Sequence, residues 1–211
     1  MGRVVKKPEE RKSEIVAAAC QLFLSKGYDS TTMKDVMVEL NIAKGTIYHY
    51  FRSKEELLEA VILSVAEEEF LRLKKIFDDS NGTALERVRH LVIAGSGRHG
   101  DGHDEIIEHL HRVDNAGMHV RLLAQLVTMQ APLYAELFTQ GCKEGVFTTS
   151  CPLEAAEFLL SGIQFLVDQG IYPWTDEQLL RRWKAFPALI ESILQAPAGS
   201  FQFLHEIIPD G

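Results

Sequence analysis

Apolar residues recur at every third or fourth position along most of the chain, which is the spacing of amphipathic helices. The pattern predicts a helix around residues 15–23, two short helices over 33–40 and 43–50, and a long helix from 53 to about 77. The long helix begins with a capping signal, because a serine at its start is followed three residues later by a glutamate. The N-terminal part of the chain is therefore expected to form a small three-helix head that leads into a long helix.

The rest of the sequence repeats the helical pattern. Helices are predicted over 84–94, 105–112, 118–140, 153–169 and 175–194, with one short helix in the tail. Four glycines within 95–104 predict a loop, and Pro132 predicts a kink inside its helix. No segment of useful length alternates as a strand would. The fold class is therefore predicted to be all-α, with a three-helix head at residues 1–52 joined by the long helix to a larger helical body at 53–211.

The two short helices of the head are separated by a short turn, which is the pattern of a helix-turn-helix. The second helix of such a unit can lie in the DNA major groove. Ile47 and Phe51 are four residues apart and are expected to face the core of the head. The polar residues of the segment then fall on its other faces: Lys44, Thr46, Tyr48 and His49. Spacing alone leaves a second interpretation open, in which the tyrosines pack against the long helix and the lysines are solvated.

Charge is distributed unevenly along the chain. Residues 1–54 contain ten Lys and Arg against six Asp and Glu, a net charge of +4, although the whole chain carries −8 and the remainder therefore −12. A basic head on an acidic body suggests that the head contacts something anionic. No apolar run approaches the length of a membrane span, and the start lacks the apolar core of a secretory signal. A cytoplasmic protein without a membrane partner is therefore expected.

The run TTMKDVMVELNIAKGTIYHYFRSKEELLEAV, residues 31–61, resembles the DNA-binding signature of the TetR (tetracycline-repressor) family of bacterial transcriptional regulators. The resemblance covers about residues 10–62. Five residue pairs stand where the family pattern has such residues: Thr31-Thr32, Lys44-Gly45, Ile47-Tyr48, Tyr50-Phe51 and Ser53-Lys54. The resemblance implies a homodimer that reads a palindromic double-stranded operator and a C-terminal body that binds a small-molecule effector. The preferred hypothesis is a repressor that the effector releases from its operator, although the same head would serve an activator.

The resemblance also implies the DNA contacts, carried over position by position: Thr32, Lys44, Gly45, Thr46, Tyr48, His49, Tyr50 and Lys54. Lys44, Gly45 and Thr46 would enter the groove. Thr32, Tyr48, Tyr50 and Lys54 would hold phosphates, and the role of His49 is left open.

The body is expected to hold a dimer surface and an effector pocket. Broad apolar stripes on the last two helices, together with the resemblance, favour an interface that includes Leu159, Ile163, Leu166, Trp183, Phe186 and Ile190. Pockets for small molecules are mostly apolar with a few polar groups, and the candidates between residues 58 and 170 are Phe70, Phe77, Met118, Leu122, Gln125, Met129, Gln164 and Phe165. Either set could instead be the core of a single chain, and this alternative is favoured for most of the pocket candidates.

Histidines raise a further alternative. Six lie within residues 90–119 beside several acids: His90, His99, His103, His109, His111 and His119. Zinc or nickel could use such ligands, which would indicate a metal-sensing regulator or a metal-dependent enzyme, although the spacing is poor for a tight site. No nucleophile elbow, phosphate loop or cofactor fingerprint occurs. The preferred prediction is a regulator with no catalytic residue, metal or cofactor, and a DNA-binding dimer without an effector is a third interpretation.

Overall fold

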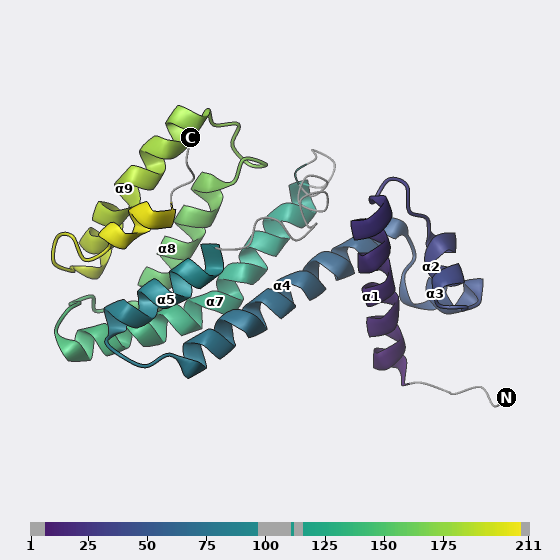
Figure 1. Ribbon diagram of the computed structural model, residues 1–211, viewed down its shortest axis with the longest axis horizontal. Helices are drawn as coiled ribbons and strands as arrows, with labels where there is room; N and C mark the ends of the chain where they lie inside the picture. The colour runs from purple at the N-terminus through teal and green to yellow at the C-terminus, as the bar shows by residue number, and fades with distance from the viewer. Residues whose placement is uncertain (1–6, 97–110, 112–115, 208–211) are drawn as a thin grey trace. The chain divides into compact units, whose positions relative to one another are not determined.

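The computed structural model describes residues 7–96, 111 and 116–207 (Figure 1). These residues form eight α-helices and a short 3-10 helix: α1 (Pro8–Lys26), α2 (Met33–Glu39), α3 (Lys44–Tyr50), α4 (Lys54–Asp79), α5 (Ala84–Ser96), α7 (Ala116–Glu144), α8 (Pro152–Val167), α9 (Asp176–Leu194) and η2 (Gln202–Ile207). No strand occurs in this part of the chain, and none of its helices is both long and apolar enough to cross a membrane. The all-α prediction is confirmed. The predicted helix at 105–112 lies outside the described residues except for His111, as does most of the predicted loop.

Local sequence signals set the ends of the short helices. Asn41, between α2 and α3, takes a left-handed conformation with φ of 50°. Ser53 caps α4, because its Oγ accepts the N–H of Glu56 at 3.1 Å. The Glu56 carboxylate accepts the N–H of Arg52 at 2.7 Å. In an ideal capping box it would accept the N–H of Ser53, one residue later. The turn and the start of α4 are therefore fixed by side chains that the sequence already identified.

Helices α1 to α3 and the part of α4 up to Glu68 form one compact unit, called the head unit below. Its interior contains apolar side chains from all four helices, including Ile15, Phe23, Val36, Ile47, Phe51 and Leu58. Ile47 is 0% exposed and Phe51 is 2% exposed, as the sequence predicts for one face of α3. The core of the head therefore anchors α3 by one side and leaves its other faces outside.

The rest of α4, from Glu69, and the helices α5 to η2 form a second compact unit, called the body unit. Within it α7 packs against α5 and α8, and α9 packs against α8 and η2. Pro132 lies inside α7, which continues past it to Glu144. The division between the units falls inside α4, whereas the sequence prediction placed a boundary at residue 52. Since Leu58 belongs to the head core and Leu73 to the body core, the two units share this one helix.

Candidate nucleic-acid interface and internal cavity

The outer face of α3 is polar and exposed. Tyr48 is 42% exposed, and the Lys44 Nζ atom lies 5.6 Å from the centre of its ring. His49 is also exposed, and its ring meets the ring of Tyr50 edge to face at a centroid distance of 5.0 Å. α3 contributes Ile47, and not these polar side chains, to the core of the head. The polar side chains can therefore contact another molecule.

Gly45 adds an independent observation about the same face. A methyl group built on Gly45 would meet no described atom within 4 Å, and its φ is not positive. Neither steric crowding nor backbone conformation inside the head therefore requires a glycine here. A glycine on an exposed helical surface does allow a second molecule to approach the backbone closely.

Thr32 has a structural role at the start of α2. Its Oγ1 accepts the Asp35 N–H at 3.2 Å and donates to the Asp35 carboxylate at 2.5 Å, while the Thr32 N–H also donates to that carboxylate at 2.8 Å. The hydrogen bonds from the Thr32 hydroxyl, and then from its N–H, lower the pKa of Asp35. Thr32 is exposed, so the residue predicted to hold a phosphate is first of all the cap of α2.

Replacing Thr32 by alanine should lower the free energy of unfolding of the head unit by about 1 kcal/mol, the usual cost of losing a capping hydroxyl. Thr32→Ser keeps the acceptor for the Asp35 N–H and is the matched control. Urea denaturation of the whole chain, followed by circular dichroism, measures both variants. Equal stabilities for the alanine and serine variants would contradict a capping role.

Lys54 begins α4 and is held on the head by two contacts. Its Nζ lies 4.0 Å from the centre of the Tyr28 ring and donates to the Asp29 carbonyl at 3.4 Å. Burial lowers the pKa of Lys54, and the nearby Asp29 opposes this shift. Tyr28 was not predicted as part of the site, although the glycine-aromatic pair at the end of α1 was a visible signal. All eight predicted DNA contacts belong to the head unit. Among them Thr46 and Tyr50 are half-buried. The ammonium group of Lys54 is positioned by the Tyr28 ring.

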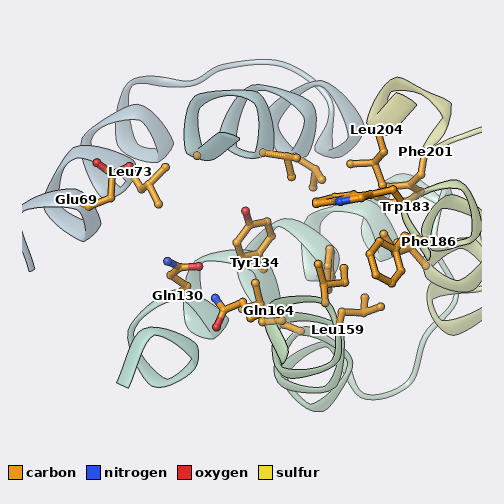
Figure 2. A pocket seen from close by; sticks show the side chains of 18 residues that line it. Glu69, Leu73, Gln130, Tyr134, Leu159, Gln164, Trp183, Phe186, Phe201 and Leu204 are labelled. Carbon is orange, nitrogen blue, oxygen red and sulfur yellow. The ribbon is translucent and has the colours of Figure 1, made fainter. Parts of the chain in front are cut away.

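The body unit encloses a cavity of about 330 Å³. Residues from α4, α5, α7, α8, α9 and the region of η2 line it, and most of them are apolar. In Figure 2 the aromatic and aliphatic side chains of Trp183, Phe186, Phe201 and Leu204 lie toward one end of the view. The size and lining are those of a small-molecule site.

Polar side chains line the other end of the view in Figure 2, where Glu69, Gln130 and Gln164 lie. Glu69 is paired with Arg72 through two hydrogen bonds, one of which joins Arg72 Nε to Glu69 Oε2 at 2.8 Å. The Oε1 atom of Gln164 is buried and has no hydrogen-bond partner among the described residues. Burial raises the pKa of Tyr134, whose phenol lines this cavity. The cavity is therefore lined by a glutamine whose carbonyl oxygen is buried and lacks a partner among the described residues, next to a largely apolar space.

Of the predicted effector residues, Gln164 lines this cavity. The other seven do not: Phe70, Phe77, Met118, Leu122, Gln125, Met129 and Phe165. The difference is one of helical register, because α7 faces the cavity through Gln130, Tyr134 and Phe138, each four residues apart. Gln125 is exposed, and Phe77 is buried in the core of the body. Phe201 and Leu204 line the cavity but were not predicted to do so, because the apolar residues of their segment do not recur at a regular spacing. The apolar side chains themselves could have indicated that this segment packs against the body.

The residues predicted for the dimer interface are mostly inside a single chain. Five of them line the cavity: Leu159, Ile163, Trp183, Phe186 and Ile190. Leu159, Phe186 and Ile190 are between 4% and 8% exposed, so they are not available to a second copy in this conformation. The apolar stripe of each helix is used first to cover its own core. Leu166 is 36% exposed, and the large exposed apolar residues of the same helices include Phe158 at 69% and Leu189 at 53%.

The histidines that the structure describes in this region do not all lie together. His90 lies exposed on α5, and His99, His103 and His109 lie outside the described residues. His111 and His119 lie together, with 4.8 Å between their ring centroids, and both are near Asp168. The predicted histidine region therefore contributes two residues to one described cluster, with an acid from much later in the chain.

Comparison with known proteins identifies relatives of both units. The family model for bacterial regulatory proteins of the tetR family matches residues 15–61, and the model for the tetracyclin repressor-like C-terminal domain matches residues 101–189. The chain is 26% identical over 149 residues to the HTH-type transcriptional repressor KstR2 of Mycobacterium tuberculosis, covering 70% of this chain and 74% of that one. It is 36% identical over 70 residues to the HTH-type transcriptional regulator HbdR of Aromatoleum, covering 33% of this chain and 26% of that one.

Solved structures show the same fold. A TetR-family transcriptional regulator from Pectobacterium atrosepticum superposes with a TM-score of 0.65 at 22% identity, covering 92% of this chain and all of that one. GusR from Salmonella enterica superposes with a TM-score of 0.56 at 20% identity over the same shares. The likeness to these structures concerns the fold of an N-terminal helix-turn-helix and a helical C-terminal body.

Proposed function

The chain belongs to the TetR family of bacterial transcriptional regulators and is a ligand-responsive, DNA-binding regulator; on this premise we propose that it is a cytoplasmic repressor. It binds a palindromic operator as a homodimer and leaves the DNA when a small molecule fills the cavity of the body. The observation that carries the proposal is the exposed polar face of α3, where Lys44 and Tyr48 stand beside a glycine that the head itself does not need.

In the proposed complex α3 lies in the major groove. Lys44 donates to base edges, Gly45 permits close approach, and Thr46 contacts bases next to them. Thr32, Tyr48, Tyr50 and Lys54 hold backbone phosphates, which fix the position of the head without reading sequence. The contact of Lys54 with Tyr28 supports this role, since it holds the ammonium group in place before DNA arrives.

The dimer interface proposed here uses the outward faces of α8 and α9. Phe158, Leu166 and Leu189 are large apolar side chains that the described residues of one chain leave between 36% and 69% exposed. Burial against the same residues of a second copy would remove this apolar surface from water. These residues replace the inward-facing members of the sequence prediction.

The proposed effector is an uncharged, mainly apolar molecule that carries a hydrogen-bond donor such as a hydroxyl. The apolar lining around Trp183 and Phe201 favours a hydrophobic body. No basic side chain is among the described residues that line this cavity, and the carboxylate of Glu69 is already paired with Arg72. A donor on the ligand would satisfy the buried Oε1 of Gln164, which costs free energy while it lacks a partner.

Binding to the DNA upstream of its own gene tests this proposal. We expect tight binding whose logarithmic affinity falls linearly with the logarithm of salt concentration, with a slope of roughly −0.9 for each phosphate neutralised. Fluorescence anisotropy at several salt concentrations measures both quantities. A flat salt response would argue against DNA as the partner, and absence of binding to this DNA calls for a selection from random genomic fragments.

The same assay tests the effector. Uncharged apolar compounds with a hydroxyl should release the DNA, whereas charged compounds of similar size should not. If DNA binding is tight but no compound of this class releases it, the operator role stands and the proposed effector class is wrong.

A further inference from the structure

We propose that His111, His119 and Asp168 form a binding site for one divalent transition-metal ion, of the kind that takes two imidazoles and one carboxylate. This site lies outside the proposed DNA interface and is not among the residues that line the cavity. It is independent of the proposed function. The inference rests on the geometry of these three side chains and on the way the surrounding backbone holds them.

The three side chains come from separate parts of the body unit and meet around the Asp168 carboxylate. His119 lies near the start of α7 and is 2% exposed, Asp168 follows the last residue of α8, and His111 precedes α7. The His119 Nε2 atom is 2.8 Å from Asp168 Oδ2, and the His111 Nε2 atom is 3.8 Å from Asp168 Oδ1. One ligand atom from each residue lies within 4.8 Å of the other two.

These separations are close to those of a shared ion. Zinc binds imidazole nitrogen and carboxylate oxygen at about 2.0–2.2 Å, so two donors on one tetrahedral ion lie roughly 3.4 Å apart. The His119–Asp168 pair, at 2.8 Å, would open slightly. The widest pair, within 4.8 Å, would close by up to about 1.4 Å to meet one ion. The charge also fits a cation. Each neutral imidazole can donate one nitrogen lone pair, and the single carboxylate supplies one negative charge.

The backbone already holds the carboxylate in position. Asp168 Oδ1 accepts the N–H of Gly170 at 2.8 Å and the N–H of Ile171 at 3.0 Å. The other oxygen, Oδ2, faces His119 and keeps a lone pair for an ion. Metal ligands are usually oriented by outer hydrogen bonds of this kind. Asp168 is therefore presented to the two imidazoles by the turn that ends α8.

Gly170 supplies a second, steric observation. A Cβ atom built on Gly170 would collide with the ring of His111. The absence of a side chain thus allows the His111 ring to lie directly on the turn that holds Asp168, where it stacks on His119 with an angle of 29° between the planes. A hydrogen bond between His119 and Asp168 alone would not need the second imidazole to be brought so close.

The donor set determines the class of ion. Imidazole and carboxylate ligands suit Zn²⁺, Ni²⁺, Co²⁺ and Fe²⁺, whereas Ca²⁺ and Mg²⁺ prefer oxygen ligands throughout. Three protein ligands leave at least one coordination position to water or another molecule. Co²⁺ is the probe of choice, because its visible absorption reports nitrogen and oxygen coordination directly.

The test uses the untagged full chain, dialysed against EDTA and then titrated with Co²⁺ and, by calorimetry, with Zn²⁺. We expect one ion per chain with a visible Co²⁺ spectrum. His111→Gln and Asp168→Asn should each weaken binding at least about tenfold, since loss of even an outer-shell partner has that effect. Asp168→Asn keeps an oxygen for the Gly170 and Ile171 N–H groups, so the turn should persist.

His90→Gln removes an exposed histidine of α5 that is outside the cluster and should bind like the parent protein. Circular dichroism establishes that each variant is folded before titration. The proposal is overturned if the parent takes up no stoichiometric ion. It is equally overturned if either His111→Gln or Asp168→Asn binds the ion as tightly as the parent, because the ion would then be held elsewhere.

Discussion

The double variant Lys44→Ala, Tyr48→Ala is expected to bind operator DNA at least about 30-fold more weakly than the parent protein, a loss of about 2 kcal/mol. Each side chain is exposed on α3 and neither belongs to the core of the head. The fold should therefore survive the substitutions while the surface that faces the groove is lost. Each single variant should lose at least about 1 kcal/mol, the lower range for a good polar contact to DNA.

The single and double variants together measure the coupling between the two side chains, because Lys44 Nζ lies 5.6 Å from the centre of the Tyr48 ring. Fluorescence anisotropy with the operator and with a scrambled duplex separates their roles. Lys44→Ala should reduce the preference for the operator, whereas Tyr48→Ala should weaken both duplexes alike.

Lys75→Ala is the matched control, since Lys75 is an exposed lysine on α4 in the body unit. It removes one positive charge without touching α3. If Lys44→Ala and Lys75→Ala had the same small effect, charge alone would explain the binding and α3 would not be the recognition helix.

The head could be predicted closely from the sequence because its signals are local. A capping pair at Thr32 and Asp35, the left-handed Asn41, and the spacing of Ile47 and Phe51 each act within a few residues. The motif that resembles the family signature lies on the same stretch. Local signals of this kind set where short helices begin and end, and packing in the core of the head then stabilises them.

The body could be predicted only as a set of helices. Its cavity depends on which side of each long helix faces which neighbour, and a shift of one residue turns a helix by about 100°. This explains why the sequence predicted Met129 as a pocket residue, whereas its neighbour Gln130 lines the cavity. For the same reason Phe186 and Ile190 were predicted to lie in a dimer interface, although both are buried in the chain's own core. Asp168 could not be connected with His119 from sequence, since only the packing of α7 against α8 brings them together.

Replacing Gln164 by leucine is expected to change stability and ligand binding in opposite directions. Its buried Oε1 atom has no partner among the described residues, and an unsatisfied buried polar atom costs about 1–3 kcal/mol. Leucine has a similar size and no polar atom, so the ligand-free variant should be more stable than the parent by up to that amount. Urea denaturation measures the gain. A loss of stability would mean that Gln164 is already satisfied.

The same substitution should weaken binding of a hydroxyl-bearing effector by about tenfold, or roughly 1.4 kcal/mol, because the ligand hydroxyl then enters an apolar environment without an acceptor. Gln125→Leu is the control, since Gln125 is an exposed glutamine of α7 that does not line the cavity. It should leave affinity unchanged. DNA release and calorimetry both report the effect.

A matched pair of ligands isolates the hydrogen bond to Gln164. A 4-alkylphenol and its O-methyl ether have nearly the same shape, but only the phenol can donate to Gln164 Oε1. The parent protein should prefer the phenol, because the ether leaves that oxygen unpaired, and Gln164→Leu should lose or reverse the preference. The four affinities form a cycle whose coupling energy isolates the one hydrogen bond. If the parent binds both compounds equally well, then the bare oxygen does not select the effector, and the apolar lining around Trp183 and Phe201 must do so alone.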